Sequence, residues 1–288
     1  VPVTPPLFLP TPTPTRSPDS YLVEAIDNVN QGKYQLAVIS YEQAINSAPD
    51  NLLIYLDLAR LEVLYGDYEK AWENSQNALL LNPNHSLANA VKGWILGRQG
   101  DYPGSTAALN TAIEIDPGNA LAYAYQAEIL AQMLNEGKGD LNTQDKAIAA
   151  SRKALDLGNG LLEVHRARGL VLEVTGNYPE AISEFQKALT INNKLADLHV
   201  ALGRNFKADN QIDSAFEEFN RAIGLNPTDP TPYVETALIY LGNGDYAKAA
   251  QMAESAIQQS PADPLLYGYL GTILYRSQNY PAAVQPLR

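Results

Sequence analysis

A period of 34 residues runs through most of this 288-residue chain. A Gly-x-Tyr triplet marks the period five times, beginning at Gly32, Gly66, Gly100, Gly176 and Gly244. After most triplets come two alanines seven residues apart and then a proline. A fixed period of about 20 to 50 residues is typical of a repeat solenoid, in which each unit packs only against its neighbours. The chain is therefore predicted to form a stack of units and not one or two compact domains.

The repeats are predicted to begin at residues 18, 52, 86, 120, 162, 196, 230 and 264. On this count seven units are complete, the fourth carries eight extra residues at about 135–142, and the eighth is truncated at Arg288. We expect the extra residues to form a surface loop between two helices, either as a tolerated insertion or as a segment that reaches a ligand. Local departures are Asn210 at the sixth corner, and Asn159 and Asn193 where a closing proline is expected.

Each signature residue has a physical reason to be there. A corner glycine supplies the left-handed conformation that ends a first helix, and the Asp or Asn that follows can cap the second helix. Small side chains also recur at one equivalent position of the first helix, where they let two helices approach closely. They are Ala25, Ala59, Gly93, Ala127, Gly169, Gly203, Ala237 and Gly271. The pattern predicts tight helical hairpins that stack on one another.

With these residues in phase from Pro18 to Arg288, the sequence resembles the tetratricopeptide repeat family. The resemblance implies an all-α fold, a right-handed superhelical α-solenoid of helix-turn-helix hairpins whose first helices line a concave surface. It also implies that a protein partner, as an extended peptide or a helix, binds in that concave groove.

The groove positions of the family, carried onto this sequence, predict the partner-binding residues. They are Arg60, Trp94, Arg98, Tyr125, Glu128, Arg166, Arg204, Lys207, Tyr269 and Tyr275. Arg60, Trp94 and Glu128 are spaced by 34 and should form a row, and Trp and Arg dominate binding hot spots. Two interpretations of Trp94 stay open: it contacts a partner, or it fills space between stacked helices. The paired Lys and Arg clamp for a C-terminal carboxylate has only a partial match, in Arg204 and Lys207.

Composition and motifs argue against several other functions. The chain has no cysteine, no GxxxxGK[ST] loop and no HExxH, so we expect no catalytic residues, no cofactor and no metal site. The net charge of −12 disfavours nucleic-acid binding, and no apolar run is long enough for a transmembrane helix. Of the three histidines, His165 and His199 lie 34 residues apart and are interpreted as packed side chains of the scaffold.

Residues 1–17 are rich in Pro and Thr and should form an extended linker or stalk. Stalks of this kind favour an extracytoplasmic protein that a removed upstream segment tethered to a bacterial membrane; a cytoplasmic linker is the alternative. The apolar segment Pro5–Pro10 is expected to cover the apolar stripe of the first repeat, or to reach a neighbouring molecule; the stripe consists of Leu22, Val23, Ile26 and Val29. The uncapped last repeat is a second surface for self-association.

The sequence therefore predicts a non-catalytic protein-interaction scaffold. The alternative is a partner-selecting or substrate-selecting array of a larger enzyme or envelope-assembly complex. A third hypothesis is a small-molecule pocket inside the superhelix. The identity of the partner is not encoded in the repeat pattern, because scaffold residues are shared across unrelated functions.

Overall fold

A computed structural model describes residues 16–283, and the expectations for Pro5–Pro10 and for the last five residues lie outside this range. Within it the structure has sixteen helices and no strand, so the predicted all-α solenoid is confirmed. The first helix of each pair is one of α1 (Pro18–Asn30), α3 (Leu52–Leu64), α5 (Ser86–Arg98), α7 (Ala120–Asn135), α9 (Leu162–Val174), α11 (Ala196–Ala208), α13 (Thr231–Gly242) and α15 (Pro264–Arg276). The second helices are α2 (Tyr34–Ser47), α4 (Tyr68–Leu81), α6 (Tyr102–Ile115), α8 (Thr143–Gly158), α10 (Tyr178–Ile191), α12 (Ile212–Leu225), α14 (Tyr246–Gln259) and α16 (Tyr280–Ala283).

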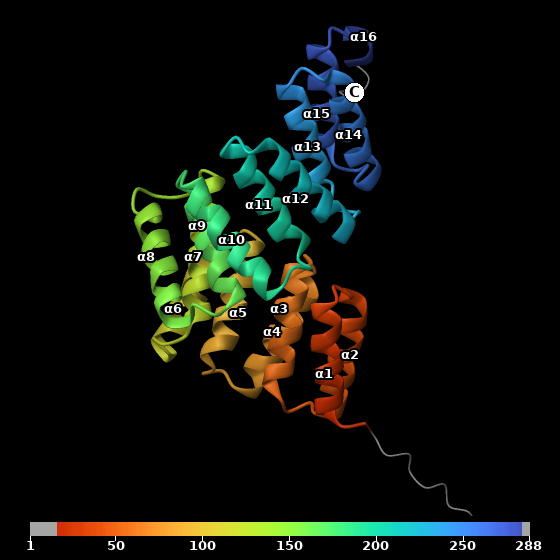
Figure 1. Cartoon of the computed structure of the whole chain (residues 1–288). Coiled ribbons are helices and arrows are strands. Elements are labelled where there is room, and N and C mark those ends of the chain that lie inside the picture. Colours follow the sequence, from red (N-terminus) through yellow and green to blue (C-terminus); the bar gives the residue numbers. More distant parts are fainter. Residues whose placement is uncertain (1–15, 284–288) are drawn as a thin grey trace, which may run out of the picture.

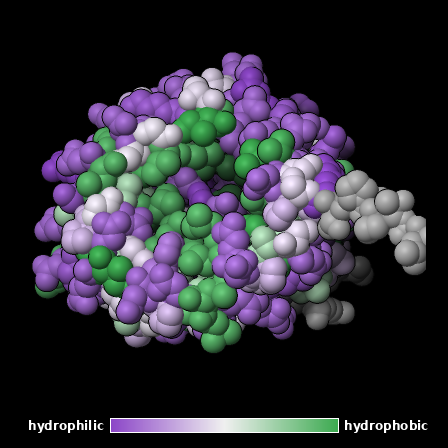
Figure 2. Space-filling model, turned by 90° about the horizontal axis from the view of Figure 1, so that it is seen from below, coloured by the Kyte–Doolittle hydropathy of each residue, from purple (hydrophilic) through white to green (hydrophobic). Residues whose placement is uncertain are grey.

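The helices form two layers that curve around a common axis. Each odd-numbered helix packs on the even-numbered helix that follows it, and each odd-numbered helix from α3 to α13 also packs on the next odd-numbered helix. The odd-numbered helices from α3 to α15 therefore make a continuous inner layer, with their partners outside it (Figure 1). Seen from the α1 end, the molecule has a hollow at its centre, with hydrophobic side chains beside it (Figure 2).

The corners have the backbone geometry that the sequence predicts. The glycine after a first helix has a positive φ, from +72° at Gly32 to +87° at Gly100. Where the Gly-x-Tyr triplet is missing, Gly137 (φ +66°), Asn210 (φ +60°) and Gln278 (φ +63°) take the same conformation. Glycine and asparagine tolerate this region best, and all three departures from the motif preserve the turn.

Small residues at the helix crossings are needed for close approach. A Cβ added at Gly203 would lie 2.6 Å from Cε1 of Phe219, and one added at Gly169 would lie 2.7 Å from Cε1 of Phe185. The facing rings therefore occupy the space that a side chain would need. Asp67 and Asp101 cap the second helices as predicted, by accepting hydrogen bonds from backbone N–H groups three residues ahead.

The eight extra residues of the fourth repeat are spread over helices and loop. Helices α7 and α8 each have 16 residues, against 13 and 14 in α3 and α4. Because Asn135 is the last residue of α7, the loop is shorter than predicted and covers residues 136–142. Its Glu136 accepts a hydrogen bond of 2.7 Å from the Tyr102 hydroxyl, and Asp140 accepts one of 2.8 Å from the Thr143 hydroxyl. The loop is thus bound to the preceding repeat.

Candidate partner-binding groove

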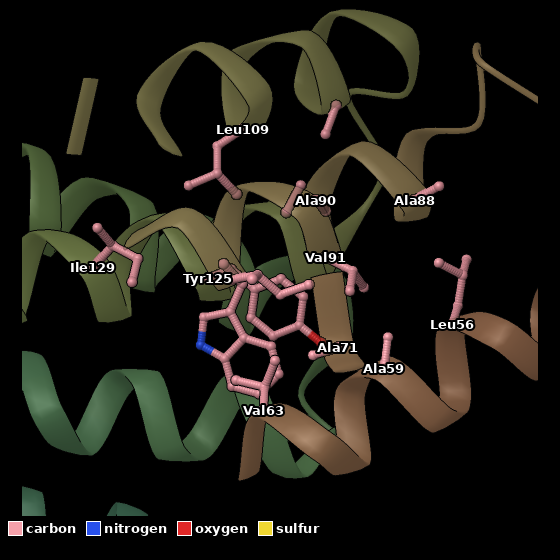
Figure 3. Close-up of a cluster of buried hydrophobic side chains, with 14 of the residues drawn as sticks. Leu56, Ala59, Val63, Ala71, Ala88, Ala90, Val91, Leu109, Tyr125 and Ile129 are labelled. Atoms are coloured by element: carbon pink, nitrogen blue, oxygen red, sulfur yellow. The ribbon is translucent and has the colours of Figure 1, made fainter. Parts of the chain in front are cut away.

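Two aromatic residues at predicted groove positions lie inside the inner layer and not on its surface. Trp94 of α5 is 1 % exposed and Tyr125 of α7 is 0 % exposed. Their rings stack with centroids 4.4 Å apart and planes within 3°, and Figure 3 shows Tyr125 among the apolar side chains of the cluster. Adjacent first helices pack directly on each other, so rings at neighbouring groove positions cover one another. The prediction that these two residues contact a partner is wrong, and Trp94 fills space between stacked helices.

A buried carboxylate, Glu128, accepts two hydrogen bonds and forms a further ion pair at this place. Its Oε1 accepts hydrogen bonds from Trp94 Nε1 at 3.0 Å and from Arg98 Nη1 at 3.4 Å. Arg166 Nη2 lies 3.5 Å from the same oxygen. A buried charge is tolerated only with such charge-assisted partners. At 2 % exposure, Glu128 holds α5, α7 and α9 together and is not free for a partner.

Arg166 completes this network and is itself 6 % exposed. It pairs with Asp197 of α11, with Nη2 3.0 Å from Oδ2, and its guanidinium lies 5.9 Å from the centroid of the Trp94 ring. Burial lowers the pKa of Arg166, but Asp197 and Glu128 together raise it above its ordinary value, so the side chain stays charged. The predicted groove residue is therefore an internal crosslink between first helices.

Arg60 does not form the predicted row with Trp94 and Glu128, because its side chain extends across the inner surface. It pairs with Asp57 one turn away, at 3.2 Å, and with Glu163 of α9, which is 103 residues distant. Nearby, Leu64 of α3 packs on the apolar cluster of α9 to α13, and a Cβ added at Gly32 would lie 3.2 Å from Cβ of Lys194. The first two hairpins thus contact the fifth, and this part of the groove is closed by the chain itself.

The groove is open farther along α5, α7, α9, α11 and α13. A pocket of about 480 Å³ is lined there by Arg98, Glu128, Ala131, Gln132, Asn135, Leu170, Glu173, Val174, Arg204 and Glu235. A second pocket of about 270 Å³ shares Arg98, Leu170 and Arg204 with it and extends to Arg166 and Asp197. Of the predicted residues, the open groove therefore brings together Arg98 and Arg204, with Glu128 and Arg166 at its base. The predicted site did not include Leu170, Glu173 or Glu235, although they occupy the same series of repeat positions.

Arg204 in the open groove and Lys207, about one turn farther along α11, carry their own counter-ions. Arg204 pairs with Glu173, with Nε 2.9 Å from Oε1, and Lys207 pairs with Glu235. Burial lowers the pKa of Arg204, but Glu173 outweighs it, so the pKa lies above its ordinary value. Arg204 and Lys207, about a third exposed, face solvent on one side. Such partly exposed pairs contribute little to stability, so an incoming anionic group could exchange with either carboxylate.

The two predicted tyrosines near the C-terminal end do not line these pockets. Tyr269 and Tyr275 of α15 are 39 % and 64 % exposed, and Tyr275 meets Tyr280 edge to face with centroids 5.4 Å apart. They belong to a separate surface at the α15 end of the stack.

The histidines have a structural explanation that the sequence only partly indicates. At their repeat position, the hydroxyls of Tyr55, Tyr233 and Tyr267 donate to the carbonyl oxygen six residues earlier. His165 Nε2 does the same to Asn159 O at 2.7 Å, and His199 Nε2 to Asn193 O at 3.2 Å. Each Nδ1 lies 2.6 Å from a buried glutamate oxygen of the same hairpin, Glu184 or Glu218. Both are buried scaffold residues, as the interpretation of the sequence has it.

Across residues 16–283, no three His, Cys, Asp or Glu side chains are placed to hold a metal ion together. None of the helices in this range has both the length and the apolar character needed to cross a membrane.

Comparisons with known families agree with the arrangement of the helices. Profiles of the tetratricopeptide repeat match residues 234–288, 162–195 and 28–51. The chain is a tetratricopeptide-repeat protein. Among curated relatives, a tetratricopeptide-repeat-containing protein of Methanocaldococcus jannaschii is 25 % identical in an alignment 146 positions long, which covers 44 % of this chain. The match spans about a quarter of that protein, 26 % of its length.

Solved tetratricopeptide-type structures have the same fold. The Cut9 and Hcn1 hetero-tetramer of the APC/C aligns with a TM-score of 0.66 at 17 % identity, over 89 % of this chain and 54 % of that one. A tetratricopeptide repeat protein of Parabacteroides merdae aligns with a TM-score of 0.55 at 15 % identity, over 89 % of this chain and 98 % of that one. The repeats themselves support a protein-interaction scaffold.

Proposed function

We propose that this tetratricopeptide-repeat protein binds a segment of a partner protein, extended or helical, in the open part of its groove. The observation that carries the proposal is the pocket around Leu170. It combines apolar side chains with polar groups that converge on the same space, as ligand sites in proteins do.

One wall of the pocket supplies apolar contact, because Ala131 of α7 lies there beside Leu170 and Val174 of α9. Burial of one aliphatic side chain from a partner would contribute about 1.5 to 3 kcal/mol. Arg98 and Arg204 flank this strip, and each already has a carboxylate partner, Glu128 or Glu173.

Gln132 provides an acceptor that the protein itself does not use. Its Nε2 donates to the Tyr102 hydroxyl at 3.2 Å and to Glu136 at 2.9 Å, while its Oε1 is buried without a hydrogen-bond partner within the described residues. An unpaired buried acceptor costs about 1 to 3 kcal/mol. A backbone N–H of a bound segment would satisfy it, which favours a peptide ligand over a purely apolar one.

The second candidate is that the array selects partners for a longer protein with an activity elsewhere. Its support is that the match covers only 26 % of the M. jannaschii protein and 54 % of the aligned Cut9 and Hcn1 chain, so such arrays occur inside longer chains. The groove would bind in the same way under both candidates.

Site-specific photo-crosslinking tests the proposal. A benzophenone amino acid placed at Val174, in the pocket wall, should crosslink to a partner in a lysate of the native organism. The matched control is the same amino acid at Leu80, which is 81 % exposed on α4. Crosslinks at Val174 that disappear with the added change Leu170→Arg support the groove. Equal products at Val174 and Leu80, or products insensitive to Leu170→Arg, would count against it.

A further inference from the structure

A separate pocket of about 670 Å³ lies between α6 and α8, with α7 as its floor. It is lined by Gln126, Leu130 and Met133 of α7, whereas the groove is lined by Glu128, Gln132 and Asn135 of the same helix. Residues two apart in a helix point about 200° apart, so the two pockets lie on opposite faces of α7. This one opens between the second helices, on the outer layer.

The insertion shapes one end of this pocket. Asp140 of the loop and Thr143 at the start of α8 line it, and the longer α7 brings Met133 to the same end. The α8 wall presents Ala149 and Ala150, whose small side chains leave the space empty. Leu109, Ile129 and Leu130 make the interior mainly apolar.

A buried hydroxyl without a partner lines the same space. Ser105 is 0 % exposed, and its Oγ has no hydrogen-bond partner in the part of the chain that is described. Ser75 and Ser151, also buried on second helices, each donate to a carbonyl of their own helix. The other repeats carry alanine at the position of Ser105, as Ala71 does. Since an unpaired buried hydroxyl is costly, Ser105 indicates a polar atom of a ligand beside it.

The opposite end of the pocket is polar and basic. Asn110, Gln126 and Lys153 line it, and Lys153 forms no ion pair among residues 16–283. Ser105 and Ala147 hold equivalent positions on neighbouring second helices, so Lys153 lies about six residues, or about 9 Å, from the level of Ser105 along the helix axis. In a chain of net charge −12, an unpaired lysine at the mouth of an apolar pocket favours an anionic group.

We propose that this pocket binds a single-chain carboxylate of about ten carbons. Its carboxylate pairs with Lys153, its chain lies on Leu109, Ile129 and Leu130, and an oxygen near its far end accepts from or donates to Ser105. This site is independent of the groove, so the proposed partner binding can fail without affecting it, and the reverse also holds.

Calorimetric titration of the full chain with 10-hydroxydecanoate and with decanoate tests the proposal. The wild type should bind 10-hydroxydecanoate at one saturable site and more tightly than decanoate, by about three- to tenfold for one added hydrogen bond. Ser105→Ala should remove this preference. Lys153→Glu should weaken the binding of both ligands about tenfold. Decyltrimethylammonium, which has a positive head group, should bind the wild type no more tightly than decanoate binds the Lys153→Glu variant.

Ala149→Trp fills the pocket from an exposed position and should abolish binding of both ligands. Ala107→Trp, an equally exposed change on α6 outside the pocket lining, is the matched control and should bind as the wild type does. Circular dichroism melts show that each variant is folded. Absence of saturable binding by the wild type, or binding that survives Ala149→Trp or Lys153→Glu, overturns the site. An unchanged preference in Ser105→Ala overturns the assigned contact and with it the proposed ligand.

Discussion

Arg60 of α3 forms an ion pair with Glu163 of α9, across 103 residues of sequence and across the inner surface of the solenoid. In a simple stack each repeat touches only its neighbours. Here the second hairpin also touches the fifth, and Leu64 packs on the apolar cluster beyond it. The curvature of the first half is therefore fixed by contacts between distant hairpins as well as by the stacking of adjacent ones.

Breaking this pair should loosen the closed half of the groove. Arg60→Met leaves the largely buried carboxylate of Glu163 without its cross-groove partner and should lower the free energy of unfolding by about 1 to 3 kcal/mol. Small-angle scattering should show a larger radius of gyration. In a double-mutant cycle with Glu163→Leu, the two losses should not add; additive losses with unchanged scattering would show that the pair does not hold the hairpins together.

Gly203 is predicted to tolerate no side chain. Gly203→Ala places a Cβ 2.6 Å from the Phe219 ring, which has to move within a packed crossing, so the variant should lose about 1 to 3 kcal/mol of stability. Gly224→Ala is the matched control, because a Cβ there meets nothing within 4 Å. It should be neutral or slightly stabilising, by up to about 1 kcal/mol, through better helix propensity. Urea unfolding that gives equal midpoints for the two variants would contradict the tight crossing.

Glu62 should make stability depend on pH. It is 1 % exposed on α3 and accepts a hydrogen bond of 2.9 Å from Asn74 Nδ2. Burial raises the pKa of Glu62 from 4.5 to about 7, against the opposing effect of the Asn74 bond. The folded state therefore holds this proton more tightly than the unfolded state, and stability falls as pH rises through the window from 4.5 to about 7.

Comparison with Glu62→Gln isolates this contribution from the other titrating groups. Relative to the variant, the wild type should lose about 3 kcal/mol of stability between pH 4.5 and pH 7.5, because folding raises the pKa of Glu62 from 4.5 to about 7. Denaturant unfolding at a series of pH values measures the difference. Parallel pH profiles for the two proteins would show that Glu62 ionises normally in the fold.

Local sequence patterns predicted the hairpins well because the decisive interactions are local. Gly32 and Gly100 do end first helices at positive φ, and Asp67 and Asp101 do cap the second helices. Even the missing triplet of the fourth repeat was compensated locally, by Gly137. Each of these features depends on a few consecutive residues, which a period in the sequence displays directly.

Local patterns could not predict which part of the groove is open. The period places Trp94 on the inner layer, but whether that layer is open depends on how far the stack curves. The curvature involves the contact of Arg60 with Glu163, whose separation of 103 residues no local pattern reveals. For the same reason the open pocket lies around Leu170, beyond the closed part, and not around the aromatic residue that looked most like an anchor.

The central claim is that a partner segment binds around Leu170 and not around Trp94. Peptides selected against the wild-type protein from a random library test it most directly, by fluorescence anisotropy with two variants. Leu170→Arg should weaken binding of the selected peptides by at least about tenfold, because it fills an apolar strip with charge. Trp94→Phe, which changes a buried ring outside the pocket lining, should bind within about threefold of the wild type if it is folded. Peptides that lose affinity for Trp94→Phe but keep it for Leu170→Arg would contradict the account.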